Sequence, residues 1–266
     1  DSACRANAIL VAADYTPFWA KTDNNHAWEV LLDANGVGKT GLHARAAKVY
    51  RKMYSKQRGA LGTIKHDDEE VPRWLRGKTY RDVTRDYFAT TTVKIALANP
   101  VPDGQRFAYA CVFNSGGWRA IHHGVIEGDT VTFTDLGRDI LYLPAYYVDG
   151  ELVGTASPFT LSHAGVVKLR EGRQSTITVA LRTAESADDG TPTLRVKEDQ
   201  THRLSLWDSI AGDWSERGLV TSDFAMPVDG VARLVRDGSR GNERPFTIQA
   251  PYGKVADTTR LAVVHW

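Results

Sequence analysis

Hydrophobic and polar residues alternate with a period of two over most of the chain after Tyr80. Successive side chains of a β-strand point to opposite faces of a sheet, so this pattern predicts strands. Turn residues such as Pro102-Asp103-Gly104 and Ser115-Gly116-Gly117 separate the predicted strands. Short strands at this spacing are typical of an antiparallel sandwich or barrel. The predicted strands are residues 91–97, 107–113, 118–125, 130–133, 140–147, 175–182, 202–207 and 260–265.

The first third of the chain has a mixed pattern. Residues 8–14 and 26–33 read as strands, and a polar segment connects them. Residues 42–56 carry the best helical pattern in the sequence, because their apolar positions fall on one face of a helix. We therefore expect helix mainly before Tyr80, with 42–56 as the longest helix or close to it. The apolar face consists of Leu42, Ala46, Val49, Tyr50 and Met53.

Composition and charge exclude several classes of function. Of the 266 residues, 42% are hydrophobic and 24% are charged, which is ordinary for a globular protein with a core. The net charge is +1, so the sequence predicts no nucleic-acid partner and no affinity for anionic membranes. The longest apolar runs, such as residues 8–13, are far shorter than the roughly 18 residues that a membrane span needs. We expect no transmembrane segment.

The two cysteines, Cys4 and Cys111, exclude a disulfide framework and a zinc cage built on cysteines. Cys111 lies within the apolar run of residues 107–113, so we expect it to be a buried apolar side chain. The adjacent His122 and His123 lie in a predicted strand. We expect them to point to opposite faces of that strand, where they cannot bind one metal ion together.

The sequence His26-Ala27-Trp28 is the most informative for chemistry. A histidine that opens a strand, after a polar loop and before a tryptophan, is common in papain-like thiol enzymes. There the imidazole deprotonates a cysteine, and a carboxylate or an amide orients the ring. A histidine in a strand is also often structural, so the tripeptide alone leaves both interpretations open.

The surrounding segments resemble the transglutaminase-like superfamily, most closely its multidomain bacterial members of the Bacteroidota type. The resemblance rests on residues Ala3–Ile9, Val11–Pro17 and Asn25–Val30, and later segments such as Tyr142-Leu143-Pro144 resemble the β-rich region that follows the core in that family. It implies an α+β fold that is predominantly β. Its parts would be a partial papain/transglutaminase-like core (1–79), an antiparallel β-sandwich (80–170) and a second β-sandwich (171–266).

The resemblance also implies a reaction, namely hydrolysis or acyl transfer at an amide by a cysteine thiolate. His26 would act as base and then as acid, and Trp28 and Trp19 would contact the substrate. Asp33 lies roughly 23 Å along the strand from His26 and cannot orient its ring. If residues 15–25 close a broad hairpin, Asp14 stands opposite His26 on the same face and can orient it. Asp14 is equally well explained as a turn residue.

The nucleophile is the main departure from the family pattern. In the family the cysteine lies near the start of the helix, well before an Ile-Pro turn, and here Ile9 already occupies the turn position. The nucleophile is therefore expected upstream of Asp1. Cys4 is the substitute within the chain, although it lies near the wrong end of the helix for the dipole to lower its pKa.

The expected substrate is a protein or peptide, with a glycan as the alternative, and an N-terminal portion of the same protein is an expected partner. No cofactor and no metal are implied, and the expected location is extracytoplasmic. The competing hypothesis is a non-catalytic β-sandwich protein with a decayed core, which binds glycan or protein. Aromatic residues could form its sugar-stacking platform, although such residues more often lie in a core. These aromatic residues are Trp118, Tyr142, Tyr146, Tyr147 and Trp207.

Overall fold

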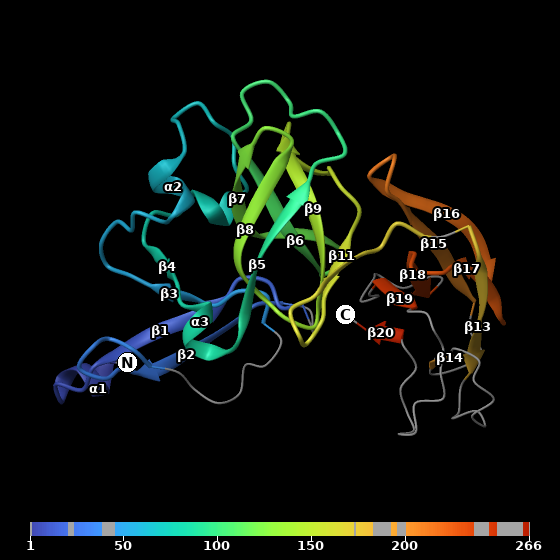
Figure 1. The fold of residues 1–266 in the computed structure, drawn as a ribbon. Helices are drawn as coiled ribbons and strands as arrows, with labels where there is room; N and C mark the ends of the chain where they lie inside the picture. Colours follow the sequence, from blue (N-terminus) through green and yellow to red (C-terminus); the bar gives the residue numbers. More distant parts are fainter. Residues whose placement is uncertain are drawn as a thin grey trace.

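Antiparallel β-sheets dominate the computed structural model of this protein (Figure 1). The prediction of a predominantly β fold is confirmed. Helix is confined to four short segments, α1 (Ser2–Ala6), α2 (Leu61–Ile64), the 3-10 helix η1 (Arg73–Arg76) and α3 (Thr84–Tyr87), among the residues that the structure describes. Those residues are 2–20, 24–38, 46–172, 174–182, 193–195, 201–236, 245–248 and 263–265.

The N-terminal part forms a four-stranded antiparallel sheet, which we call the first sheet. Its strand order is β2-β1-β3-β4, so β2 and β4 are its edges. Alternate residues of β1 are buried, as expected for a strand with one face against a core. The strands are β1 (Val11–Thr16), β2 (His26–Leu31), β3 (Tyr50–Lys52) and β4 (Tyr80–Asp82).

The predicted helix over residues 42–56 is wrong wherever the structure describes that segment. Residues 46–49 have no regular structure, and β3 follows them. All residues from 46 to 51 are buried, and their charged side chains have partners on different elements. Lys48 donates to the carbonyl oxygens of Thr134 and Asp135, whereas Arg51 bonds to β1. An extended chain lets the two side chains reach these different partners at once, so tertiary contacts outweigh the helical preference that the apolar spacing indicates. Residues 42–45 lie outside the described residues.

The middle of the chain forms one antiparallel sheet that curls into a nearly closed barrel (Figure 1). We call it the barrel-like sheet. Its strand order is β12-β11-β9-β6-β7-β8-β5, and β10 pairs with β9. The strands are β5 (Thr90–Ala96), β6 (Phe107–Asn114), β7 (Gly117–Glu127), β8 (Thr130–Gly137), β9 (Ile140–Val148), β10 (Glu151–Gly154), β11 (Phe159–Leu161) and β12 (Val167–Leu169).

Strand β6 is buried along its whole length because apolar clusters cover both of its faces. Ala108 and Ala110 belong to the barrel interior, together with Phe133 of β8. Tyr109 and Cys111 belong to a second cluster that also contains residues before the barrel. Burial on both faces explains the continuous apolar run in the sequence. The expected burial of Cys111 is confirmed, and burial raises the pKa of its thiol.

The C-terminal part contains two smaller sheets. The three-stranded sheet has the order β14-β13-β17, and the five-stranded sheet has the order β16-β15-β18-β19-β20. Apolar residues of both sheets, such as Val179 and Leu204, form a cluster of their own. The strands are β13 (Thr176–Arg182), β14 (Thr193–Arg195), β15 (His202–Asp208), β16 (Asp213–Val220), β17 (Phe224–Pro227), β18 (Val231–Arg236), β19 (Pro245–Ile248) and β20 (Val263–His265).

Three tryptophans connect the C-terminal part to the barrel-like sheet. The ring of Trp118 on β7 lies 5.8 Å from that of Trp207 on β15 and 6.5 Å from that of Trp214 on β16. Trp207 and Trp214 also pack against the barrel interior cluster. Glycine at position 154 allows this close packing, since a Cβ atom there would lie 3.0 Å from the Trp207 ring. Large aromatic contacts of this kind attach the two parts to each other.

The sheets relate to the three expected domains as follows. The first sheet ends with β4 at Asp82, and the barrel-like sheet comprises strands between Thr90 and Leu169. The strands of the remaining two sheets begin at Thr176. The division into independent domains at residues 79 and 170 stays a prediction. None of the helices in the described ranges is long and apolar enough to cross a membrane.

Candidate functional site

Strand β2 places His26 at the surface, next to two tryptophans. His26 is the first residue of β2, and its side chain is exposed. The Trp28 ring stacks on the imidazole at a centroid distance of 5.4 Å, and the Trp19 ring meets it edge-on at 6.0 Å. Both tryptophans are half-buried. The structure thus brings together three of the residues predicted for the site, which we call the His26 group: His26, Trp19 and Trp28.

The expected pairing of Asp14 with His26 is wrong. In the β1–β2 ladder, Asp14 lies opposite Trp28, and Thr16 lies opposite His26. The prediction assumed a hairpin connection of residues 15–25, but the two strands stay paired for two further residues. Asp14 is fully buried, and its carboxylate accepts hydrogen bonds from Arg51 at 2.8 and 2.9 Å. The Asp14 carboxylate is therefore bound to a guanidinium and does not orient the imidazole.

Asp14 is instead connected to His26 indirectly, through Tyr87 and Trp28. The Tyr87 hydroxyl donates to Asp14 Oδ2 at 2.7 Å and accepts from Trp28 Nε1 at 2.8 Å. Burial, followed by the hydrogen bond to Asp14, raises the pKa of Tyr87, so the phenol stays protonated and remains a donor. The chain of hydrogen bonds fixes the Trp28 ring that stacks on His26. Asp14 thus contacts the His26 group only through Tyr87.

Arg51 ties the same strands to the segment that follows β2. Besides its two bonds to Asp14, its guanidinium donates to the carbonyl oxygens of Gly36 at 2.7 Å and Gly38 at 3.1 Å. A guanidinium has five N–H donors in a fixed plane, which suits such a cluster of acceptors. Sequence reasoning missed Arg51 because 37 residues separate it from Asp14. The predicted helix over residues 42–56 also gave no reason to expect a contact between Arg51 and β1.

Asn114 is a second residue that sequence reasoning missed. It ends β6 of the barrel-like sheet, and its side-chain amide donates to the carbonyl oxygens of Trp19 and Asn24, both at 2.9 Å. The Trp19 backbone N–H also donates to the Asn24 carbonyl at 3.0 Å. Asn114 of the barrel-like sheet therefore holds both Trp19 and Asn24 close to His26. Asn114 precedes a turn in the sequence, and this position gave no signal of a distant contact.

Cys4 does not lie beside His26. It belongs to α1, whose end is close to the start of β1, since the Ile9 N–H donates to the Cys4 carbonyl at 2.9 Å. His26 pairs with Thr16 at the other end of β1. The five residue steps between Val11 and Thr16 span about 17 Å at about 3.3 Å per residue. The interpretation of Cys4 as the thiol partner of His26 is wrong for this arrangement of the strands.

We expect iodoacetamide to alkylate Cys4 at the rate of an ordinary partly exposed thiol. The His26→Ala variant should label at the same rate, because the imidazole is too far away to deprotonate Cys4. Mass spectrometry of peptides after timed labelling measures both rates. Cys111 should stay unlabelled in the folded protein, and Cys4→Ala is the control that identifies the peptide. A slower reaction of Cys4 in His26→Ala would contradict the separation of the two residues.

The two adjacent histidines of β7 differ from the expectation. A β-bulge shifts the β6–β7 register, so that Ala110 pairs with His122 while Cys111 pairs with Ala120. The extra residue changes the direction of the side chains that follow it. The rings of His122 and His123 lie 5.2 Å apart and line one pocket, so the prediction of opposite faces is wrong. Within the described part of the chain, no group of three His, Cys, Asp or Glu side chains could hold a metal ion.

The aromatic residues considered for a sugar platform belong to the packed interior or its margins. Tyr142 and Tyr146 are buried inside the barrel-like sheet. Trp118 and Trp207 pack against the same cluster and against each other. Tyr147 packs on the other face, with its ring 6.3 Å from that of Tyr109. Packing of these aromatic side chains in the protein interior accounts for them without a bound sugar. The His26 group therefore remains as the candidate site.

The comparisons with known proteins add no assignment to this geometry. No family model matches the chain, and no curated protein and no solved structure matches it significantly. The candidate site therefore rests on the residues and contacts described above.

Proposed function

We propose that His26 is the general base, and then the general acid, of a transglutaminase-like site for amide hydrolysis or acyl transfer. The observation that carries the proposal is an exposed imidazole between two tryptophans, at the start of an edge strand that buried polar contacts hold in place. Imidazole is the side chain whose ordinary pKa is closest to neutral, so it can both accept and return a proton. Half-buried indole rings can contact the substrate on either side of it.

The reaction follows from the chemistry of thiols and amides. The imidazole takes the thiol proton, and the thiolate attacks the carbonyl carbon of the amide. The C–N bond breaks, and the imidazolium gives its proton to the leaving amine. A water molecule, or a second amine, then attacks the thioester while His26 again accepts a proton. Release of the acid or of the new amide restores the thiol.

The thiol must come from a segment other than residues 1–266. Cys111 is buried in the cluster between β6 and the residues before the barrel, and Cys4 lies at the far end of β1. A thiol with an ordinary pKa is only a few per cent thiolate at neutral pH, so it needs contact with the base. In this proposal the N-terminal portion of the same protein supplies the nucleophile, as the family resemblance implies.

Exposed apolar side chains near α1 support this requirement. Ile9, Leu10 and Leu31 are 47%, 56% and 63% exposed. They lie together, because Val11 pairs with Leu31 and the Leu32 N–H donates to the Leu10 carbonyl. Contiguous exposed apolar residues are typical of surfaces that another polypeptide segment covers.

The decisive test is the activity of the full-length protein after His26→Gln substitution. The assay measures incorporation of a labelled primary amine into a glutamine-containing peptide, together with ammonia release. We expect kcat to fall at least about a hundredfold, the usual contribution of a general base. His163→Gln is the matched control, because His163 is 96% exposed and lies outside the site.

Retained activity in His26→Gln, within about twofold of the parent, would refute the assignment of His26. No activity in the parent protein, combined with quenching of tryptophan fluorescence by an added glycan, would favour the glycan-binding alternative. Fluorescence quenching that disappears in Trp28→Leu would place that glycan on the His26 group.

A further inference from the structure

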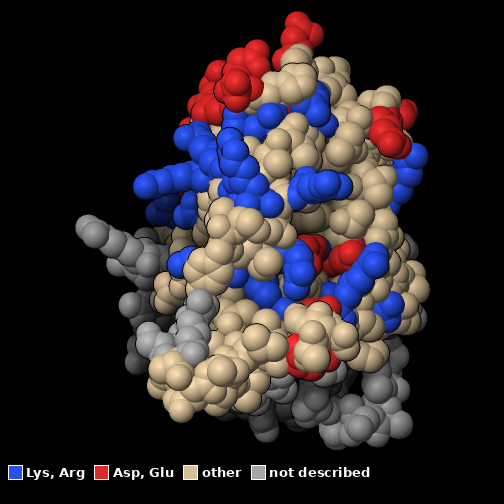
Figure 2. All heavy atoms as spheres, turned by 90° about the vertical axis from the view of Figure 1, so that its left-hand side faces the viewer, with Lys and Arg blue, Asp and Glu red and all other residues tan. Residues whose placement is uncertain are grey.

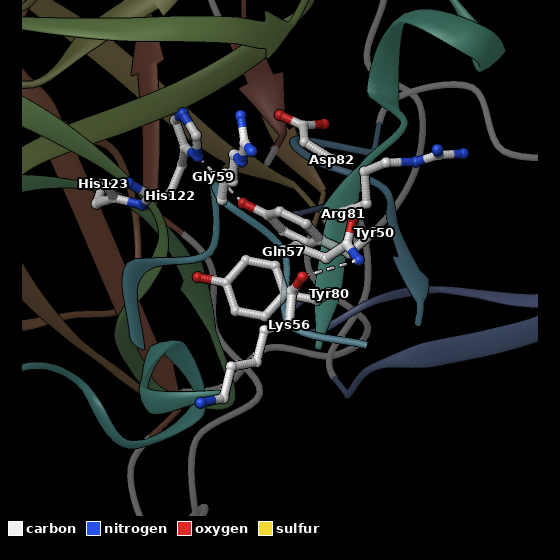
Figure 3. Close-up of a pocket in the computed structure, with 10 residues that line it drawn as sticks. Tyr50, Lys56, Gln57, Gly59, Tyr80, Arg81, Asp82, His122 and His123 are labelled. Carbon is white, nitrogen blue, oxygen red and sulfur yellow. Dashed lines mark hydrogen bonds between the residues drawn. The ribbon is translucent and has the colours of Figure 1, made fainter. Parts of the chain in front are cut away.

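A pocket of about 470 Å³ opens at the edge of the first sheet that is opposite to His26. Tyr50 of β3, residues 56–59, β4, and both histidines of β7 line it (Figure 3). The volume lies in the range of small-molecule sites. Strands β2 and β4 are the two edges of the sheet, about 14 Å apart at about 4.8 Å per strand. The pocket is therefore distinct from the His26 group.

The surface around this pocket is strongly basic, although the whole chain is nearly neutral. Residues 46–85 contain eleven Lys and Arg but five Asp and Glu. Figure 2 shows Lys and Arg side chains gathered on the face that carries this segment, with acidic side chains at its upper end and a few among the basic ones in its lower half. At the pocket itself Lys56, Arg58 and Arg81 are exposed, and they form no ion pair with any described residue. Their charge is available to a ligand.

Polar groups line the inner wall of the pocket. The Tyr50 hydroxyl donates to the Ile121 carbonyl at 2.9 Å and lies 3.1 Å from His122 Nδ1. His122 Nε2 lies 3.2 Å from the Thr134 hydroxyl, so both ring nitrogens of His122 have partners. His123 Nδ1 is buried and has no hydrogen-bond partner among the described residues. An unpaired buried nitrogen is costly, and this one belongs to a side chain that lines the pocket.

One carboxylate, that of Asp82, also lines the pocket, and its charge is already compensated. Asp82 Oδ2 forms an ion pair with the buried Lys48. Asp82 Oδ1 accepts hydrogen bonds from the Thr84 N–H at 3.0 Å and from the Thr84 hydroxyl. With Asp82 paired to Lys48, the three unpaired cations decide the charge that a ligand meets in the pocket.

We propose that this pocket binds a small ligand that carries at least two anionic groups, either carboxylates or phosphates. Lys56 and Arg81 extend from the pocket in different directions (Figure 3), so separate anionic groups of one ligand suit them better than a single oxyanion. A ligand with two such groups reaches both cations while its body faces Tyr50, Tyr80 and His123. Arginine binds both carboxylate and phosphate through paired N–H donors, so the shared chemistry is that of oxyanions.

The first test is isothermal titration calorimetry of the chain with citrate and with pyrophosphate, and with acetate as the single-charge reference. We expect citrate or pyrophosphate to bind and acetate at the same concentration to show no binding. The ligand that binds better identifies carboxylate or phosphate as the source of the anion. Binding of acetate as tightly as citrate would overturn the requirement for two anionic groups, and binding of none of the three would overturn the proposal.

Paired charge variants separate the pocket from general surface charge. The double variant Lys56→Gln/Arg81→Gln removes the two cations of the proposed site and should weaken binding at least about tenfold. Lys94→Gln/Arg217→Gln is the matched control, because it removes two exposed positive charges from β5 and β16, and its affinity should stay within about twofold of the parent. An equal loss in both double variants would overturn the proposal.

Imidazole NMR signals give a second readout that does not depend on charge removal. Saturating ligand should shift the ring signals of His123 and leave those of the exposed His163 unchanged. Unchanged His123 signals during binding would place the ligand outside the pocket and overturn the proposal. Tight binding of a single-stranded oligonucleotide that citrate does not displace would assign the basic face to nucleic acid, which also overturns it.

Discussion

Substitution of Arg51 by Met is expected to lower the free energy of unfolding by about 3–5 kcal/mol at neutral pH. The variant leaves the fully buried Asp14 carboxylate without its guanidinium partner. Removing one member of a buried ion pair is strongly destabilising, because the other charge stays buried without compensation. The carbonyl oxygens of Gly36 and Gly38 also lose a donor. Urea denaturation followed by tryptophan fluorescence measures the change.

Two further variants show whether the buried pair causes this loss. The double variant Asp14→Leu/Arg51→Met removes both charges and should recover at least half of the lost stability. Arg76→Gln removes a half-exposed ion pair with Glu70 and should change the denaturation midpoint very little. If Arg51→Met destabilises the protein no more than Arg76→Gln does, the Asp14–Arg51 pair is not what joins β1 to β3.

The protein is also expected to lose stability as the pH falls below about 6.5, because the buried His122 and the partly buried His123 are held in their neutral form. Burial, with a smaller contribution from Lys48, lowers the pKa of His123 to about 4, and the same causes hold the pKa of His122 well below its ordinary value. Between pH 6.5 and pH 4 the unfolded chain binds a proton at His123 that the folded chain does not. The contribution of neutral His123 to the free energy of unfolding is therefore complete above the pKa that this histidine has in the unfolded chain. It is lost as the pH falls toward the pKa of the folded protein. For His123 the loss is about 3 kcal/mol.

The His123→Gln variant isolates this contribution. Its free energy of unfolding should fall less steeply than that of the parent between pH 7 and pH 4, with a difference of about 3 kcal/mol at pH 4. Urea titrations at fixed pH values provide the measurement. The exposed His163→Gln variant is the control and should follow the parent curve. Parallel curves for His123→Gln and the parent would show that His123 is not buried as a neutral ring.

The candidate site could be predicted only in part. The order of residues around His26-Ala27-Trp28 identified an exposed histidine on a strand, and Trp19 and Trp28 do contact its ring. The predicted role of Asp14 depended on the register of β1 and β2. The observed register differs from the predicted one by two residues, so Trp28 and not His26 lies opposite Asp14. Tyr87 and Asn114 were not predicted, because they come from distant elements and carry no local motif.

The segment from Ala46 to Lys56 shows why a local pattern can mislead. Its apolar residues have helical spacing, yet Lys48 and Arg51 must reach carbonyl and carboxylate oxygens on two different sheets. A short helix also gains little stability on its own, so packing decides its conformation. The pair His122-His123 gives a second case, since strand alternation predicts opposite faces but both rings line the same pocket.

The predominantly β architecture, the approximate positions of most strands and the burial of Cys111 could all be predicted from the amino-acid sequence. These features depend on alternation, turn residues and continuous apolar runs, all of which are local properties of the chain. Three other features became visible only in the folded chain: the middle sheet curls into a barrel, Asp14 pairs with Arg51, and Cys4 lies far from His26. Strand order, register and ion pairs join residues that are distant in sequence, and local patterns do not specify which distant partners meet.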